Sequence, residues 1–268
     1  MSTSNTNFRK LHDSEKLLIL PNAWDVGSAL LFEKLGASAI ATTSAGVAWT
    51  LGYSDGDKLD PKKLAELAAA IVRSIAIPLS VDVEGGYSLD AIRAVENIKP
   101  ILDAGVAGIN IEDGANSFDL LLAKVAKIRS AAEALGTDVF INVRTDVYLQ
   151  SLVPAEEQIK ETIRRGKAAK EAGADGFFIP SLANEEAIKA IVEGIDLPIN
   201  LMAWPDLPDA TELNKLGVKR LSAGSAISQI VWKNATDIAT DFLNTGNSGP
   251  LMKDNLDYSF MQSLAKLH

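Results

Sequence analysis

Short runs of apolar residues alternate along this chain with longer segments whose apolar residues recur at helical spacing. The short runs are typical of strands buried on both faces, and they fall at 17–24, 37–45, 79–85, 108–113, 138–146, 176–181, 198–204 and 219–224. Helical segments lie between them at 26–35, 61–74, 88–104, 119–135, 154–172, 184–193 and 211–216. Repeated strand–helix units predict a parallel sheet, and eight of them close most naturally into a (β/α)8 barrel, a TIM barrel.

The main alternative for this pattern is a doubly wound open sheet. Such folds often carry a G-x-G-x-x-G sequence after the first strand, and this chain has none there. The length of 268 residues also suits one barrel domain. We therefore expect an α/β protein with the (β/α)8 architecture.

The pattern changes near the C-terminus. Residues 244–250 read Asn-Thr-Gly-Asn-Ser-Gly-Pro, which is a turn-rich break. We therefore assign residues 1–243 to the barrel and residues 244–268 to a linker and a C-terminal helix. One face of that helix is apolar, with Leu256, Phe260, Leu264 and Leu267 at helical spacing. It would pack either on a second subunit or on its own barrel, and the sequence leaves both open.

Composition and charge exclude several classes of function. The chain has 26 basic and 35 acidic residues, a formal charge of −9, which argues against nucleic acid or an anionic membrane as the main partner. It has no cysteine, so zinc–thiolate sites and a thiol nucleophile are excluded. The histidines, His12 and His268, lie near the two ends and give little support to a histidine-based triad. The first residues are polar and no apolar run approaches ~18 residues, so we expect a cytoplasmic protein.

Carboxylates close two neighbouring apolar runs of the predicted barrel. Asp82 and Glu84 end the run 79–85, at a spacing that points both to one side of a strand, and Glu112 ends the run 108–113. Such a pocket of like charges is costly unless a cation neutralises it, and clustered oxygen ligands suit Mg²⁺ or Mn²⁺. Asp55, in the loop after the second predicted strand, would join this group.

An arginine and a small polar turn complete the predicted rim. Arg144 ends the fifth predicted strand and offers a bidentate fork to an anion. Thr42-Thr43-Ser44-Ala45-Gly46 forms a small polar turn whose amides and hydroxyls could hold a carboxylate or enolate oxygen. Together these residues indicate a metal and a small anionic substrate at the carboxyl ends of the strands.

Structural roles compete with each of these interpretations. Asp113 and Asp146 could only cap the helices that follow them, and Arg144 could simply neutralise a neighbouring acid. Residues 222–225, after the last strand, could form a phosphate loop or merely a tight turn.

Four motifs, in this order and spacing, resemble the isocitrate lyase/phosphoenolpyruvate mutase superfamily. They are Leu51-Gly52-Tyr53-Ser54-Asp55, Val81-Asp82-Val83-Glu84-Gly85-Gly86-Tyr87, Ile111-Glu112-Asp113 and Val143-Arg144-Thr145-Asp146. The resemblance runs from residue 18 to about residue 224. It implies a (β/α)8 barrel, often with a helix exchanged between subunits in a dimer of dimers, so we expect a homo-oligomer, a dimer or a tetramer. It also implies Mg²⁺ or Mn²⁺ holding a 2-oxo acid or its enolate while a neighbouring C–C or C–P bond is made or broken.

The resemblance also implies roles for individual residues. Asp82 would be the direct metal ligand, and Glu84, Glu112 and Asp55 would hold metal-bound waters. Glu84 stands where many relatives have the shorter aspartate. The substrate oxygens would lie on Thr43, Ser44 and Ala45, and Arg144 would clamp the substrate carboxylate. Arg144 and Asp55 are thus the predicted catalytic residues.

Two departures from the superfamily pattern narrow the prediction. The lyase branch uses a cysteine as its acid, and this chain has none. The mutase and hydrolase branches have a longer gating loop after the fourth strand, whereas here residues 114–118 leave only Asn116 and Ser117 to reach the substrate. Tyr53 and Tyr87 are the remaining candidates for a general acid or base.

These observations predict a metal-dependent lyase or decarboxylase that stabilises the enolate of a small 2-oxo acid. Chemistry on the C–P bond of phosphonopyruvate-like substrates is one alternative. A catalytically impaired protein that binds a metal and a dicarboxylate is another. A third is an unrelated phosphate-binding barrel that uses residues 222–225.

Overall fold

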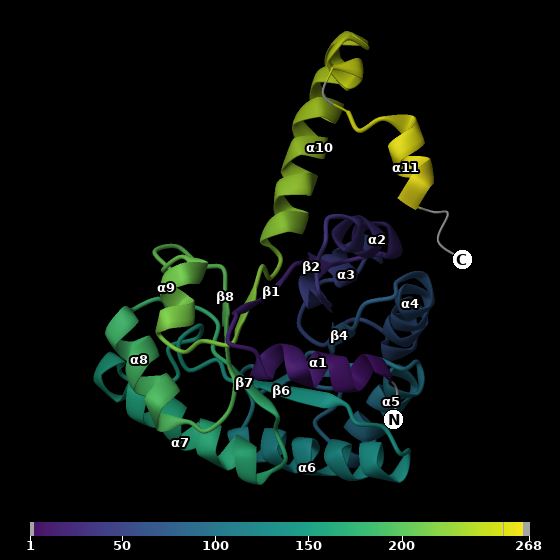
Figure 1. Ribbon diagram of the computed structural model, residues 1–268. Helices are drawn as coiled ribbons and strands as arrows, with labels where there is room; N and C mark the ends of the chain where they lie inside the picture. Colours follow the sequence, from purple (N-terminus) through teal and green to yellow (C-terminus); the bar gives the residue numbers. More distant parts are fainter. Residues whose placement is uncertain (1–2, 254, 265–268) are drawn as a thin grey trace.

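The computed structural model describes residues 3–253 and 255–264 and shows a barrel of parallel strands surrounded by helices (Figure 1). All eight predicted strand segments form strands, and the predicted barrel is confirmed. The strands are β1 (Leu18–Leu20), β2 (Asn22–Ala23), β3 (Ile40–Thr42), β4 (Leu79–Asp82), β5 (Gly108–Glu112), β6 (Phe140–Arg144), β7 (Gly176–Phe178), β8 (Ile199–Met202) and β9 (Arg220–Ser222).

The first predicted strand is divided in two because Pro21 lacks the N–H that a continuous ladder needs. On one side of the proline β1 pairs with β9, and on the other β2 pairs with β3. The remaining strands pair in chain order, and every pairing is parallel. The two halves of one strand thus close the sheet into a barrel.

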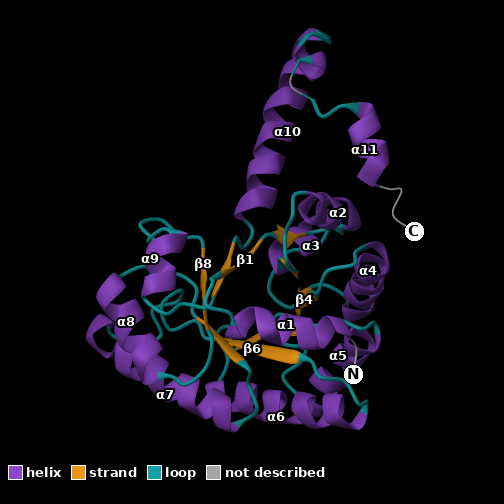
Figure 2. Ribbon diagram, in the orientation of Figure 1, coloured by secondary structure: helices purple, strands orange, loops and turns teal. Residues whose placement is uncertain are grey.

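The seven predicted helical segments are all helical and cover the outside of the barrel (Figure 2). They are α2 (Val26–Lys34), α4 (Pro61–Ser74), α5 (Ala91–Asp103), α6 (Phe118–Ala134), η1 (Ala155–Glu157) with α7 (Gln158–Glu171), α8 (Glu185–Gly194) and α9 (Ala210–Lys215). Four further helices complete the described chain: α1 (Thr3–Asp13), α3 (Ser44–Thr50), α10 (Ala226–Thr245) and α11 (Tyr258–Leu264). Of these, only α11 was predicted, and η2 (Pro250–Met252) is a single turn before it.

Helix α1 closes the amino-terminal end of the barrel. Its Phe8 is fully buried and packs with Leu18, Leu20, Ala41 and Phe140 inside the barrel. The ring of His12 stacks on Phe140 with their centroids 4.0 Å apart. A packed plug at this end leaves the opposite end, where the carboxyl termini of the strands lie, for chemistry.

Helices α10 and α11 lie at the edge of the fold. Helix α10 points away from the barrel, and α11 folds back toward α2 (Figure 1). Gly246, at φ 65°, ends α10 in the left-handed conformation, inside the predicted break. Leu264 is buried on the core of its own chain, whereas Leu267 and His268 lie outside the described residues. No helix in the described ranges has the length and apolarity needed to cross a membrane.

Candidate active site

The carboxyl end of β4 places Asp82 at the mouth of the barrel. Asp82 is buried, and its backbone N–H donates to the hydroxyl of Thr42 at 2.8 Å. Its side chain accepts the backbone N–H of Glu84 at 3.0 Å. Glu84 has a φ of 49°, so the strand alternation ends at Asp82 and the backbone turns there. The two carboxylates still lie close enough for the charge of Asp82 to raise the pKa of Glu84.

Glu84 and Asp57 lock two loops together. Glu84 Oε2 accepts the backbone N–H groups of Gly56, at 2.8 Å, and of Asp57. In return Asp57 Oδ1 accepts the N–H groups of Gly85 and Tyr87, at 3.1 and 2.9 Å. One oxygen of Glu84 is therefore committed to holding the loop that carries Asp55. Its other oxygen, Oε1, is buried and has no hydrogen-bond partner among the described residues.

Arg144 lies between two carboxylates at the end of β6. Its Nε and Nη2 atoms donate to Asp146 at 2.7 and 3.0 Å, and its Nη1 atom lies 2.5 Å from Glu112 Oε2. The guanidinium is also 6.0 Å from the centre of the Phe178 ring. Arg144 thus neutralises the neighbouring acids, as the alternative interpretation predicted, and its guanidinium is fixed at the acidic rim. A substrate anion could replace Glu112 as its partner there.

Burial dominates the electrostatics of the acidic rim. Loss of solvation raises the pKa of Asp82, and the nearby Asp55 charge raises it further. Burial and the charges of Asp82 and Asp55 raise the pKa of Glu84 to about 7. Burial raises the pKa of Glu112 well above its usual range, although Arg144 opposes this. Carboxylates that resist ionisation together are a donor set that a divalent cation would stabilise.

The predicted oxyanion turn is the start of a helix. Thr43 caps α3 and accepts the N–H of Gly46 at 3.4 Å, Ser44 is the first helical residue, and Ala45 is buried behind it. The N–H groups of Ser44 and Ala45, in the first turn, have no intrahelical partner and lie at the positive end of the helix dipole. The local structure therefore differs from the predicted turn but keeps two amides that could bind an anion.

The other predicted site residues are Asp55, Asn116 and Tyr87, and they differ in their exposure to solvent. Asp55 is exposed but close enough to raise the pKa values of Asp82 and Glu84. Asn116 is exposed in a turn after β5, with its backbone N–H on Asp113 O. Burial and the charge of Glu84 raise the pKa of Tyr87, so its hydroxyl stays protonated beside the rim.

Two predicted alternatives acquire structural partners. The Asp113 carboxylate pairs with Arg165 from α7 and accepts the N–H of Asp146 at 3.1 Å, which is a structural role. After β9, the N–H groups of Ala223 and Gly224 donate to Asn22 Oδ1 at 2.8 and 2.9 Å. Because a side chain already takes these amides, residues 222–225 form a tight turn rather than an open phosphate loop.

Two residues that sequence reasoning missed also belong to this end of the barrel. Asp57 holds the loop after Glu84. Thr42, the first residue of the predicted polar turn, instead supports Asp82. Ser181, just beyond β7, has a φ of 66°, and its hydroxyl is buried without a partner among the described residues. Strain at a strand end is a signal of function, but it is not visible in sequence.

The fit of a metal to this rim rests on ligand chemistry. Among the described ranges, no group of three or more acidic or histidine side chains is arranged to hold a metal ion. Glu112 is engaged with Arg144 and one oxygen of Glu84 with loop amides. The buried, unpartnered Oε1 of Glu84 and the raised pKa of Asp82 nevertheless fit a hard divalent cation that prefers oxygen ligands.

The fold is a (β/α)8 barrel that carries acidic side chains and an arginine at the carboxyl ends of its strands. Barrel enzymes have their active sites at this end. A model of the phosphoenolpyruvate phosphomutase family matches residues 8–243. The chain belongs to this family, within the phosphoenolpyruvate mutase/isocitrate lyase superfamily, as the motifs predicted.

Three relatives show the range of the family. An uncharacterized protein of Mycobacterium tuberculosis is 35% identical and covers 82% of both chains. The 2,3-dimethylmalate lyase of Eubacterium barkeri is 28% identical, covering 97% of this chain and 93% of its own. A solved structure from Burkholderia cenocepacia J2315, assigned to the phosphonomutases, is 34% identical with a TM-score of 0.84, covering 89% of this chain and all of its own. Lyases, decarboxylases and mutases thus all occur among the relatives.

Proposed function

We propose that this chain is a cytoplasmic, divalent-metal-dependent lyase that stabilises the enolate of a small 2-oxo acid formed by cleavage of a C–C bond. One observation carries the proposal: the buried Asp82 from β4 and the half-buried Glu112 from β5 lie near Arg144 from β6 at the carboxyl ends of the strands. A rim of this kind suits a cation and an anionic substrate together. The full-length similarity to a dimethylmalate lyase supports C–C rather than C–P chemistry.

We assign the acidic residues of the rim to the metal, and Arg144 and the backbone amides to the substrate. Asp82 would hold the metal, Mg²⁺ or Mn²⁺, with support from Glu84, Glu112 and Asp55. When bound, the metal would act as a Lewis acid toward the substrate oxygens. Arg144, held in place by Asp146, would bind the substrate carboxylate. The amides at the start of α3 would stabilise negative charge on an oxygen.

A thermal-shift titration tests the binding half of this proposal. Metal-stripped protein is titrated with Mg²⁺ and then with oxalate, an analogue of a pyruvate enolate. A ligand that binds only the folded state raises the melting temperature in proportion to its affinity. We expect oxalate to stabilise the protein only with Mg²⁺, and to do so in Asp90→Ala, a control at the exposed cap of α5, but not in Asp82→Ala. A shift that is independent of Mg²⁺, or that survives in Asp82→Ala, would contradict the proposed site.

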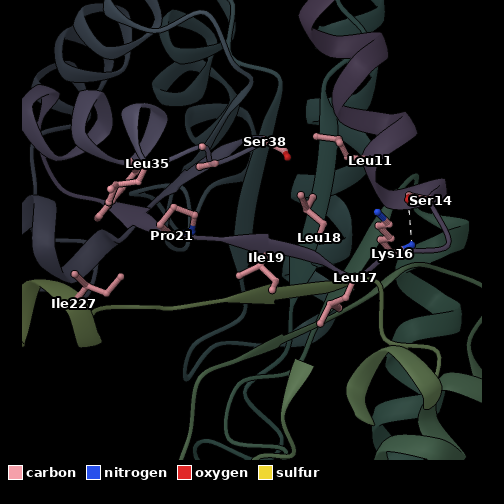
Figure 3. Close-up of a pocket in the computed structure, with 13 residues that line it drawn as sticks. Leu11, Ser14, Lys16, Leu17, Leu18, Ile19, Pro21, Leu35, Ser38 and Ile227 are labelled. Atoms are coloured by element: carbon pink, nitrogen blue, oxygen red, sulfur yellow. Dashed lines mark hydrogen bonds between the residues drawn. The ribbon is translucent and has the colours of Figure 1, made fainter. Parts of the chain in front are cut away.

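We also propose that the chain assembles as a homo-oligomer through α10. This helix leaves the barrel and exposes Ile230, Trp232 and Leu243, with Leu243 83% exposed. Beside its start, an apolar groove of about 610 Å³ runs over β1 and α2 (Figure 3). Ile19 lies on this groove and is 55% exposed. The groove over β1 and the exposed face of α10 are both apolar, and a second copy of the chain would cover both.

Molar mass in solution tests this assembly. Light scattering after size-exclusion chromatography should give a multiple of the 28.5 kDa chain mass. Trp232→Glu, in the apolar part of α10, should shift the mass to that of a monomer. Leu89→Glu, an exposed leucine in the loop before α5, serves as the matched control and should leave the oligomer intact. A monomeric wild-type protein would refute the proposed assembly.

A further inference from the structure

An arginine lies inside the barrel without a carboxylate partner. Arg220, in β9, is only 1% exposed, and none of the ion pairs among the described residues includes it. Its Nη2 atom donates to Asn110 Oδ1 at 3.2 Å, while its Nε and Nη1 atoms have no partner in the described part of the chain. A buried, unpaired guanidinium is costly, so its presence calls for a role beyond packing.

The hydrogen bond from the Arg220 guanidinium fixes the orientation of the Asn110 amide. Two donors converge on one atom of Asn110: Arg220 Nη2 at 3.2 Å and Asn142 Nδ2 at 2.9 Å. Only the carbonyl oxygen of an amide can accept both, so the amide nitrogen must face the other way. That nitrogen lies 3.5 Å from Asp82 Oδ2.

The second donor is itself held in place. Asn142 Nδ2 also donates to Asn200 Oδ1 at 3.0 Å, and Asn200 donates to the hydroxyl of Ser222 at 3.3 Å. All of these side chains are buried. A belt of amides therefore crosses the barrel interior, with Asp82 and Arg220 both hydrogen-bonded to Asn110.

We propose that Arg220 is a positioning residue for the metal site, acting through Asn110 to hold the carboxylate of Asp82 in one orientation. This inference rests on the proposed function, because it assigns Asp82 to the metal. Hydrogen bonds behind metal ligands commonly change metal affinity by 10–100-fold when they are removed. Arg220 touches neither the metal nor the substrate in this arrangement, so it is distinct from Arg144.

The sign of one measurement separates positioning from simple electrostatics. Arg220 carries a positive charge inside the barrel, and its charge is stabilised by Asp82. By Coulomb's law alone, removing this charge should tighten the binding of a divalent cation. If Arg220 positions Asp82 through Asn110, its removal should instead weaken the binding.

Mn²⁺ binding to metal-stripped protein, followed by electron paramagnetic resonance, provides the test. We expect Arg220→Met to weaken Mn²⁺ affinity at least tenfold and Arg220→Lys to restore part of it. Asn110→Leu should weaken the affinity by a similar factor, and Arg220→Met should add little to it in the double variant. The melting temperature of Arg220→Met should not fall, because an apolar side chain replaces an unpaired buried charge.

Arg129→Met is the matched control. Arg129 pairs with Asp175 at the other end of the barrel, so its loss should lower the melting temperature and leave Mn²⁺ affinity unchanged. Unchanged or tighter Mn²⁺ binding in Arg220→Met, or unchanged binding in Asn110→Leu if Arg220→Met does not fold, would overturn the inference. Wild-type protein that binds no Mn²⁺ would overturn the proposed function and this inference together. Wild-type protein that binds Mn²⁺ as tightly as Arg220→Met does would overturn the inference alone.

Discussion

His12 should make the stability of this fold depend on pH between about 3 and 6.5. Its ring is buried against Phe140, and its Nδ1 atom contacts Phe8 O at 2.9 Å. Burial, together with the charges of Arg220 and Arg9, lowers the pKa of His12 from 6.5 to about 3. The folded state therefore keeps His12 neutral where the unfolded chain binds a proton, so stability is complete above pH 6.5 and falls as the pH decreases.

The magnitude follows from the two pKa values. Where the unfolded chain binds one more proton than the folded state, the free energy of unfolding falls by roughly 1.4 kcal/mol per pH unit. Because the unfolded His12 is only half protonated at pH 6.5, the total fall between pH 6.5 and 4.5 is roughly 2 kcal/mol. Other groups act in the opposite direction: the pKa of Glu84 is raised to about 7 and that of Asp113 to about 6, so protonation favours their folded forms. The effect of His12 must therefore be taken as a difference between two proteins.

Urea denaturation of the wild type and of His12→Phe, at several pH values, isolates this difference. The phenyl ring preserves the stacking on Phe140 but cannot titrate. We expect the variant to be less sensitive to acid, so that the stability difference between the two proteins moves in its favour by roughly 2 kcal/mol from pH 6.5 to 4.5. A difference that stays constant over this range would refute the reasoning, because His12 would then titrate alike in both states.

Two further substitutions test the packing and the ion pairs. A Cβ atom at Gly108 would lie 2.7 Å from Phe8 Cε1 and 3.1 Å from Phe140 O. Gly108→Ala should therefore lower the free energy of unfolding, measured in urea, by about 2 kcal/mol. An unchanged value would mean that α1 packs loosely against the barrel. Arg165→Met leaves the buried Asp113 without its cation and should lower the free energy of unfolding by about 3 kcal/mol. Oxalate should still stabilise this variant in Mg²⁺. Loss of that stabilisation would place Asp113 in the active site.

The barrel could be predicted from sequence because its signals are local and repeated. Each strand is a short apolar run, and each predicted helix has its own spacing of apolar residues. Helix α1 was missed because its composition is polar and only a few side chains, such as Phe8, reach the core. Helix α3 was missed because the small residues after β3 are as typical of a turn as of a helix start.

The site was predictable where strand ends carry charge and unpredictable where contacts join distant segments. The positions of Asp82 and Arg144 follow from their strands. The backbone reversal at Glu84 and its exchange of hydrogen bonds with Asp57 do not, because a left-handed φ and a loop 27 residues away leave no periodic trace. Arg220 and Asn110 are 110 residues apart, and only closure of the barrel brings them together.

Proton NMR of oxaloacetate turnover tests the central proposal most directly. Spectra recorded in Mg²⁺ would follow pyruvate formation with the wild type, with Asp82→Ala and with metal alone, and 2-methylated malates would be screened in the same way for C–C cleavage. The account predicts that the wild type cleaves at least one of these acids well above the metal-only rate and that Asp82→Ala does not. Wild-type protein that binds Mg²⁺ and oxalate but cleaves none of them would contradict the assignment as a lyase of this kind.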